Sequence, residues 1–444
     1  MVHTLELSKE ISQETYEAML QSLADGRYNR VAWYTKAYAE KGIPMVCLRK
    51  FKPRRRDKNG KWVVLESEPF IYMAIMSVNP GKMFGIDGYH SSNSSIFTPD
   101  FAKAIYQKIF EQIPELEVLH DYKEQGDMQY WNTGIYPKIL KEYDAMNTFK
   151  LRRIDYAFDI STTSEQYIQL IEWGKGIRRK SYKRQRFDVE EIVEHLEDVD
   201  DEEPDFEDSE ELFQEYIPDI KYIYYKSKSL NINIYLKGDQ LKKRGLLAED
   251  DNAFDFLRIE IQVKKNKLNA INQKYGIHGR DFHKMPIPEL EAEILTYYMN
   301  QLTGNGTYVE YDTAMEIIDK SNFRTNKKMK LKKLIYLIAQ NHGIKTVLDK
   351  VENGDISDLG KMSTVRTYLK DIETMGINPT TISDAMKECT PTTEFVNQTG
   401  TRNLNRVVLA NLVDVIKWYN QQKLDERQHG MVVTQEDLNQ IDNL

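Results

Sequence analysis

The segment FLRIEIQVK, residues 256–264, alternates apolar and polar side chains from Leu257 onward. Two further segments, LRRIDYAFDI at residues 151–160 and LNINIYLK at 230–237, alternate in the same way. Successive side chains of a β-strand point to opposite faces of the sheet. The three segments therefore predict strands of one sheet, apolar on the face toward the core and polar on the other face.

The polar face of this predicted sheet collects groups that suit phosphate chemistry. Carboxylate oxygens bind hard cations such as Mg²⁺ or Mn²⁺, and a tyrosine hydroxyl can attack phosphorus to form a covalent ester. The pattern favours metal-assisted phosphodiester chemistry with a tyrosine nucleophile. The polar positions are Arg153, Asp155 and Asp159, then Asn231, Asn233, Tyr235 and Lys237, then Arg258, Glu260, Gln262 and Lys264.

Within this set we assign the nucleophile to Tyr235 and the metal ligands to Asp155 and Glu260. Lys237 lies two residues from Tyr235 on the same face, where it could lower the tyrosine pKa or stabilise the transition state. Arg258 could contact a phosphate through two parallel hydrogen bonds.

Asp159 is not expected to share a metal ion with Asp155. Four strand residues at about 3.3 Å each separate the two by ~13 Å, so Asp159 is given a supporting or structural role. Three nearby tyrosines compete with Tyr235 as nucleophile, namely Tyr222, Tyr224 and Tyr225.

The composition is that of a folded protein with two or three domains. The chain has 444 residues, of which 41% are hydrophobic and 11% aromatic. No apolar run approaches the ~20 residues that cross a membrane, and the first residues lack the apolar core of a signal peptide. The only cysteines, Cys47 and Cys389, are far apart in sequence. We therefore expect a reducing compartment and no membrane partner.

The charge distribution favours nucleic acid despite a net charge of −8. Residues 188–215 hold 16 Asp or Glu and no Lys or Arg, which leaves 61 basic residues against 53 acidic ones elsewhere. Basic runs at 49–61, 178–186 and 324–333 could bind the phosphate backbone. The acidic segment predicts a surface insertion, which either mimics DNA against the binding face or is a solvated loop.

The sequence pattern changes near residue 286. The predicted fold is α+β: an antiparallel sheet with flanking helices over residues 1–285, with the acidic insertion at 188–217, followed by a mostly helical domain at 286–444. Helices are expected at 312–319, 328–341, 364–375 and 403–420. Near the N-terminus, 45–51 and 61–65 flank a turn with an Asn-Gly signal and predict a hairpin.

Four blocks of this chain resemble, in order and spacing, the gene II replication proteins of filamentous bacteriophages. MSVNPGKMFG (76–85) is similar to the family's strand ending in a Pro-x-Lys turn, and LRRIDYAFD (151–159) to its Arg-Ile-Asp strand. INIYLKGDQL (232–241) resembles its segment with the nicking tyrosine, and FLRIEIQVKKNKLNAINQKYGI (256–277) its Arg-x-Glu strand with a basic stretch. With C-terminal similarities, the resemblance covers residues 70–420.

The resemblance implies a fold distantly like other rolling-circle nucleases. It implies Tyr235 as nucleophile and Asp155 and Glu260 as the acidic residues. Asp159 and the acidic insertion have no counterpart in the family pattern, so Asp159, like Gln262, is expected to support the site. The residues expected to contact phosphate or DNA are Lys82, Arg153, Lys237, Arg258, Lys264 and Lys265.

The resulting hypothesis is a rolling-circle replication initiator of a phage or plasmid, acting in the cytoplasm of a bacterial host. It would nick single-stranded or supercoiled origin DNA, hold the 5′ phosphate on Tyr235 and later rejoin the strand, together with a host helicase and polymerase. Two alternatives remain open: a conjugative relaxase of the same chemistry, and an origin-binding replication protein without nuclease activity.

Overall fold

The computed structural model describes most of the chain, with gaps that include the whole acidic insertion at 188–217. The described residues are 2–22, 31–33, 36–58, 61–85, 99–116, 148–161, 164–175, 183–185, 222–227, 229–243, 245–248, 250–252, 255–277, 279–285, 287–387, 390, 392–396, 402–421 and 432–433. The predictions for residues 188–217 therefore lie outside the described part of the chain.

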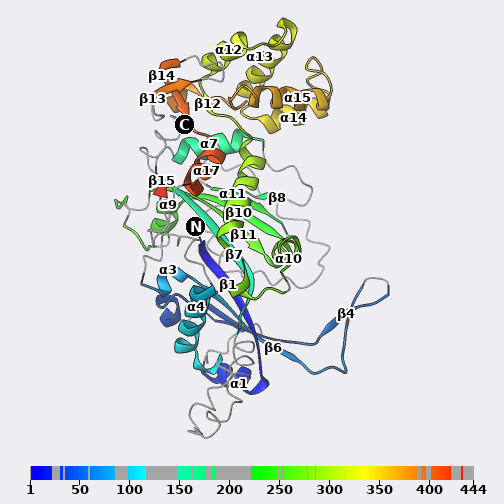
Figure 1. Ribbon diagram of the computed structural model, residues 1–444, viewed down its shortest axis with the longest axis vertical. Coiled ribbons are helices and arrows are strands. Elements are labelled where there is room, and N and C mark those ends of the chain that lie inside the picture. The colour runs from blue at the N-terminus through cyan, green and yellow to red at the C-terminus, as the bar shows by residue number, and fades with distance from the viewer. Residues whose placement is uncertain are drawn as a thin grey trace.

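A large sheet forms the centre of the molecule (Figure 1). Among the described residues it has ten strands, nine of them in the order β2-β3-β6-β1-β7-β11-β10-β9-β8, and neighbours along this path are antiparallel. The tenth, β15, pairs in parallel with β7. The strands are β1 Val2–Ile11, β2 Val31–Trp33, β3 Met45–Phe51, β6 Ile71–Val78, β7 Lys150–Ile160, β8 Lys183–Gln185, β9 Tyr222–Lys226, β10 Leu230–Leu236, β11 Leu257–Lys264 and β15 Val432–Val433.

The three alternating segments that predicted the sheet are the adjacent strands β7, β11 and β10. Their register brings Arg258 opposite Asp159 on one side and opposite Tyr235 on the other. Glu260 lies opposite Ala157 and Asn233. The predicted α+β fold, with an antiparallel sheet and flanking helices, is therefore confirmed.

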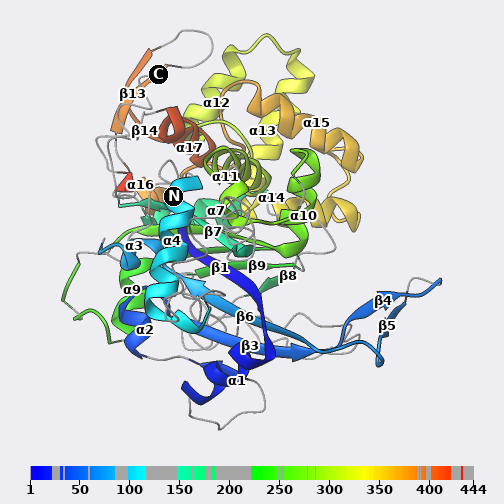
Figure 2. The ribbon, with the colours of Figure 1, turned by 60° about the horizontal axis from the view of Figure 1, so that its bottom comes forward.

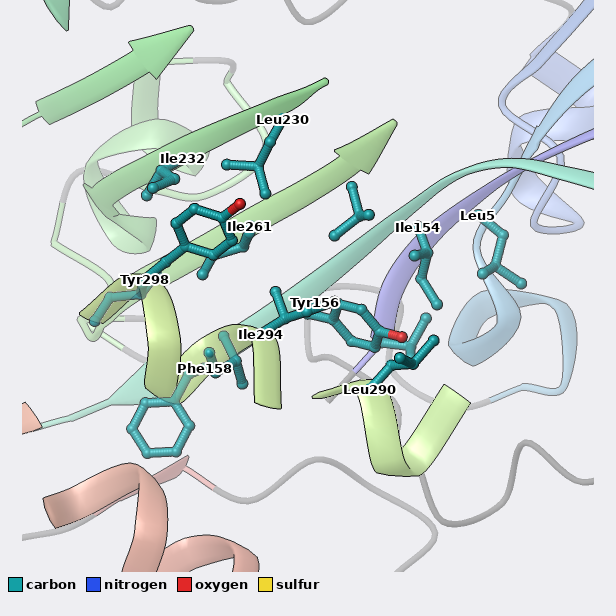
Figure 3. Close-up of a cluster of buried hydrophobic side chains, with 14 of the residues drawn as sticks. Leu5, Ile154, Tyr156, Phe158, Leu230, Ile232, Ile261, Leu290, Ile294 and Tyr298 are labelled. Atoms are coloured by element: carbon teal, nitrogen blue, oxygen red, sulfur yellow. The ribbon is translucent and has the colours of Figure 1, made fainter. Parts of the chain in front are cut away.

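The apolar face of the sheet is covered by helices, which explains why its side chains are hydrophobic. These include α4 Pro99–Gln112, α7 Ser164–Trp173, α10 Lys265–Lys274, α11 Ile287–Thr303 and α17 Leu412–Gln421. Tyr156, Phe158 and Ile261 of the sheet lie against Leu290, Ile294 and Tyr298 of α11 (Figure 3). Each fully buried aliphatic or aromatic side chain contributes about 1.5–3 kcal/mol, so α11 is part of the core that holds the sheet.

A second core lies in the C-terminal helices α12 Tyr311–Lys320, α13 Thr325–Gln340, α14 Ile344–Glu352 and α15 Met362–Glu373. A small sheet of β12 Tyr308–Val309, β14 Arg402–Leu409 and β13 Thr392–Val396 lies next to it. The predicted helix at 403–420 is wrong in its first half, because β14 pairs with both of these strands before α17 begins. The mostly helical character of the C-terminal part is confirmed.

The predicted domain boundary at residue 286 assigns α11 and α17 to the C-terminal domain. In the structure both helices belong to the same hydrophobic core as the large sheet. The second core begins only at Val309. Tyr156 adds a polar link across the same boundary, since its hydroxyl donates a 3.2 Å hydrogen bond to the backbone carbonyl of Ile287.

The predicted hairpin between 45–51 and 61–65 has other partners in the structure. β3 pairs with β6, whereas β5 Trp62–Val64 pairs with β4 Arg54–Arg56 in a separate two-stranded ribbon. The ribbon extends beyond the main sheet (Figure 2). The remaining described elements are α1 Gln13–Ser22, α2 Lys36–Glu40, α3 Pro80–Met83, α9 Lys237–Lys243, α16 Asp384–Lys387 and the 3₁₀ turns Pro114–Leu116 and Phe282–Lys284.

Within the described ranges, none of the helices has both the length and the apolar character required to cross a bilayer.

Candidate active site on the polar face of the sheet

The polar face of β1, β7, β11, β10 and β9 carries a buried cluster of ionisable side chains. Asp155, Asp159, Tyr235, Arg258 and Glu260 each retain at most 4% of their accessible surface. Charged residues this deeply buried need partners, because transfer from water costs several kcal/mol per unpaired group. The hydrogen bonds within the cluster show how that cost is met.

Tyr235 and Glu260 meet on adjacent strands. The Tyr235 hydroxyl donates a 2.8 Å hydrogen bond to Glu260 Oε1. Burial raises the pKa of Tyr235 well above its usual value, and the negative charge of Glu260 raises it further. The resting side chain is therefore a neutral phenol whose proton already points at a carboxylate.

Asp155 lies one strand further along, on β7. Arg153 holds it through hydrogen bonds of 3.0 Å from Nε and 3.4 Å from Nη2. Burial nevertheless raises the pKa of Asp155 to about 7, with Arg153 opposing the shift and the charge of Glu260 adding to it. The charge of Glu260 contributes to this rise, so the two carboxyls lie near enough to repel one another.

Asp159 and Arg258 form a bidentate ion pair. Arg258 Nε and Nη2 each donate a 2.7 Å hydrogen bond to one carboxylate oxygen of Asp159. Arg258 is 0% exposed, and its Nη1 lies 4.0 Å from Glu260 Oε1. The guanidinium is used internally, so contact of Arg258 with DNA stays a prediction and would require release from Asp159. The supporting role given to Asp159 agrees with this geometry.

Lys237, the predicted partner of Tyr235, lies near the tyrosine ring but hydrogen-bonds to another residue. Lys237 is the first residue of α9, so the strand pattern ends one residue before it. Its Nζ donates a 2.8 Å hydrogen bond to Gln240 and lies 5.9 Å from the centre of the Tyr235 ring. A cation at this distance stabilises negative charge on the phenol only weakly, and the pKa of Tyr235 is raised rather than lowered.

The other predicted site residues differ in their exposure to solvent. Gln262 accepts a 3.0 Å hydrogen bond from Asn231 and supports the face beside Asp155. Lys264 is 8% exposed, with its Nζ 3.5 Å from the Ser227 carbonyl oxygen, so its predicted contact with DNA would require it to move.

Two predicted DNA contacts are accessible. Lys265, at the start of α10, is exposed, and so is Lys82 in the short helix α3, whose first turn is capped by Asn79. Arg153 is partly exposed, but Asp155 and Glu6 hold its guanidinium.

Two side chains of β1, His3 and Glu6, also belong to this cluster, and neither was predicted from the sequence. His3 Nδ1 lies 3.7 Å from Glu260 Oε1. Glu6 accepts a 2.9 Å hydrogen bond from Arg152 and lies 3.8 Å from Arg153. Apolar and polar side chains alternate along much of residues 2–11, and this pattern would have predicted a strand with His3 and Glu6 outside its apolar face.

Tyr222 was considered only as a competitor of Tyr235. Its ring centroid lies 5.8 Å from that of Tyr235, directly across from it on β9. Burial and the charge of Glu260 raise its pKa well above the usual value.

Three side chains of this face could hold part of the coordination of Mg²⁺ or Mn²⁺, namely Asp155, Glu260 and Asn233. Among the described residues no group of three or more His, Cys, Asp or Glu is arranged to hold a metal. Mg²⁺ is commonly held by one or two carboxylates with waters and substrate phosphates, so Asp155 and Glu260 suffice in number. Asn233 lies opposite Glu260, and its buried Oδ1 has no hydrogen-bond partner among the described residues. A hard cation would satisfy that oxygen.

No protein-family model and no curated protein matches this chain.

Proposed function

We propose that the protein is a nicking and joining endonuclease that initiates rolling-circle replication, with Tyr235 as its nucleophile. The observation that carries the proposal is the 2.8 Å hydrogen bond from Tyr235 to Glu260, on the face that also holds Asp155. A phenol, a proton acceptor and a second carboxylate are the groups that transfer of a DNA strand to tyrosine requires. The resemblance to gene II replication proteins supports the same assignment.

In the proposed reaction, the proton of Tyr235 passes to Glu260 as the phenolic oxygen attacks the phosphorus of the origin DNA. The new bond joins Tyr235 to the 5′ phosphate, and the bond to the 3′ oxygen breaks. That oxygen takes up a proton and leaves as a free 3′ hydroxyl. Since one phosphoester replaces another, attack by a 3′ hydroxyl reverses the step and rejoins the strand without ATP.

The high pKa of Tyr235 means that the site needs a positive charge to stabilise the phenolate during the reaction. Transfer of the proton to Glu260 would move the negative charge onto the phenolic oxygen, beside the charged phosphate, in a buried environment. A divalent cation, held by Asp155 and Glu260 with Asn233 beside them, would lower the cost of that charge and neutralise the phosphate. Arg258 keeps Glu260 oriented while Asp159 fixes Arg258.

Access of DNA is a second requirement. Tyr235 is 4% exposed, so a phosphate reaches its hydroxyl only when the polar face opens. Single-stranded DNA suits such a site better than a duplex, because one strand occupies less width. The protein is proposed to act in the bacterial cytoplasm and to hand the free 3′ end to a host polymerase and helicase.

The test is formation of a covalent adduct that survives SDS. Wild-type protein, labelled origin DNA and Mg²⁺ or Mn²⁺ should give the adduct, and Tyr235→Phe should give none while still binding DNA. Tyr222→Phe is the matched control, because Tyr222 is a buried tyrosine whose ring lies 5.8 Å from that of Tyr235. Mass spectrometry of the trapped peptide identifies the residue directly, and an adduct on Tyr222 would overturn the assignment.

The near-complete burial of the ionisable cluster favours a second candidate, a non-catalytic origin-binding replication protein. In that case the pairs on the polar face only stabilise the sheet. Absence of an adduct with any divalent metal, together with sequence-specific binding of duplex origin DNA, would favour this candidate. A conjugative relaxase would instead give the adduct with transfer-origin DNA.

A further inference from the structure

The ribbon of β4 and β5 has an unusual distribution of charge. Residues 49–64 carry eight basic side chains and one acidic side chain in a protein whose net charge is −8. We call residues 52–70, which connect β3 to β6, the basic arm. The basic side chains at the base of the arm and along it are Arg49, Lys50, Lys52, Arg54, Arg55, Arg56, Lys58 and Lys61, and the acidic side chains of the arm are Asp57, Glu66 and Glu68.

The arm also exposes large apolar side chains. Trp62 is 55% exposed, Val63 47% and Val64 37%. The arm projects from the body of the molecule in both views (Figures 1 and 2). Exposed apolar groups of this kind mark contact with a partner, and the surrounding positive charge indicates that the partner is negatively charged.

The described part of the arm is an ordered ribbon. Opposing residues place Arg54 with Val64 on one face of the ribbon and Arg55 with Val63 on the other, and the backbone of Arg56 pairs with Trp62. Backbone hydrogen bonds of 2.8 Å continue the pairing on both sides, from Leu65 to Pro53 and from Asp57 to Lys61.

The two sides of the arm are joined at its base, beside the end of β3. Lys52 Nζ donates hydrogen bonds to the backbone carbonyls of Glu66 at 2.9 Å and Glu68 at 2.5 Å. Lys50 and Lys52 lie 4.5 and 4.4 Å from the centre of the Phe70 ring. A ribbon held in this way loses little conformational entropy when it binds.

We propose that the basic arm binds duplex DNA by entering the major groove. That groove is about 12 Å wide and admits a two-stranded β-ribbon. Arginines on both faces can reach phosphates on both walls of the groove, while Trp62 and Val64 offer apolar contacts to thymine methyl groups. The arm would hold double-stranded DNA beside a site that, as proposed above, acts on a single strand.

This proposal does not depend on the nuclease activity. It concerns a different surface and a different form of DNA, and its test needs no covalent chemistry. Binding can therefore be measured in the Tyr235→Phe background without divalent cations, so that failure of the arm and failure of the nicking assignment give separate results.

The test compares three proteins by fluorescence anisotropy on a labelled 30-base-pair duplex and on a single strand of equal length, over a range of salt concentrations. They are the Tyr235→Phe protein, the same protein with Arg54→Ala, Arg55→Ala and Arg56→Ala, and a charge-matched control with Lys103→Ala, Lys274→Ala and Lys284→Ala. The control removes three exposed lysines of the body. Circular dichroism establishes that each variant is folded.

The arm variant should bind the duplex about 10- to 100-fold more weakly, and its slope of log K against log salt should fall by about 2 to 3. Its affinity for the single strand should change by less than about twofold, and the control should keep both affinities within about threefold. Trp62→Ala should weaken duplex binding by about three- to tenfold with an unchanged salt slope, as expected for an apolar contact.

Three results would overturn the proposal. One is a loss of duplex affinity no greater than that of the lysine control. Another is an equal loss for the single strand, which would make the arm a general electrostatic surface. The third is a change in oligomeric state on sedimentation with DNA binding unchanged, which would make the arm a contact between protein chains.

Discussion

Arg258 on β11 and Asp159 on β7 hold each other through two hydrogen bonds of 2.7 Å, fully buried inside the polar face. This pair holds the guanidinium 4.0 Å from Glu260, which in turn accepts a 2.8 Å hydrogen bond from Tyr235. The carboxylate that Tyr235 contacts therefore lies beside a buried ion pair.

Breaking this ion pair from one side should destabilise the fold. Asp159→Leu or Arg258→Met alone is expected to cost about 3–5 kcal/mol in the free energy of unfolding, because each leaves a buried charge without its partner. The double variant replaces both charges by apolar groups and should recover most of the loss. Urea denaturation of the four proteins measures the coupling, and single variants within about 0.5 kcal/mol of wild type would show that the pair is not structural.

The stability of the protein should depend on pH through Asp155. Its pKa in the folded chain, about 7, is above the ordinary value because burial disfavours the charged form. A raised carboxyl pKa gives a contribution that is complete below the unfolded pKa near 4 and is lost as pH rises through about 7. The largest effect on the free energy of unfolding is about 4 kcal/mol, because the pKa rises from about 4 to about 7 and each pKa unit corresponds to about 1.4 kcal/mol.

Urea unfolding at pH 4.5, 6 and 7.5 provides the measurement. Relative to Asp155→Asn, which cannot ionise, the wild-type protein should lose stability steadily across this range. Parallel curves for the two proteins would show that Asp155 ionises normally in the fold.

Glu260→Gln should separate the acidity of Tyr235 from its reactivity. Removal of the negative charge should lower the pKa of Tyr235, because Glu260 raises it by charge and by hydrogen bonding. Adduct formation should nevertheless fall about 10²- to 10⁴-fold, the usual contribution of a positioned base. Ultraviolet titration of tyrosinate and the adduct assay give the two values, and a variant with unchanged adduct yield would exclude Glu260 as the proton acceptor.

Helix α11 should protect the central strands, although the sequence assigned it to another domain. Leu290→Ala with Ile294→Ala removes apolar cover seen against the sheet in Figure 3, at a cost of about 2–5 kcal/mol per residue. Hydrogen exchange with mass spectrometry should then show faster exchange in β7 and β11. The matched variant Leu334→Ala with Ile338→Ala lies in the second core and should leave that exchange unchanged.

Local alternation in the sequence predicted much of the site. Asp155, Tyr235 and Glu260 could be placed on the polar face because side chains of a strand alternate between its two faces. This alternation can be read from the sequence without knowing which strands are neighbours. The same logic failed at Lys237, where the chain turns into α9. It also failed at residues 402–409, whose strand exists because β12 and β13 lie on either side.

The α+β class, the polar and apolar faces of the sheet and most residues of the candidate site could be predicted without a structure, because they depend on side-chain periodicity. Tertiary structure alone decided the strand order, the hydrogen bond from Tyr235 to Glu260, the internal use of Arg258 and the packing of α11 and α17 on the sheet. These features arise from contacts between residues that are far apart in the chain, and no local pattern specifies which partner a strand or a charge will meet.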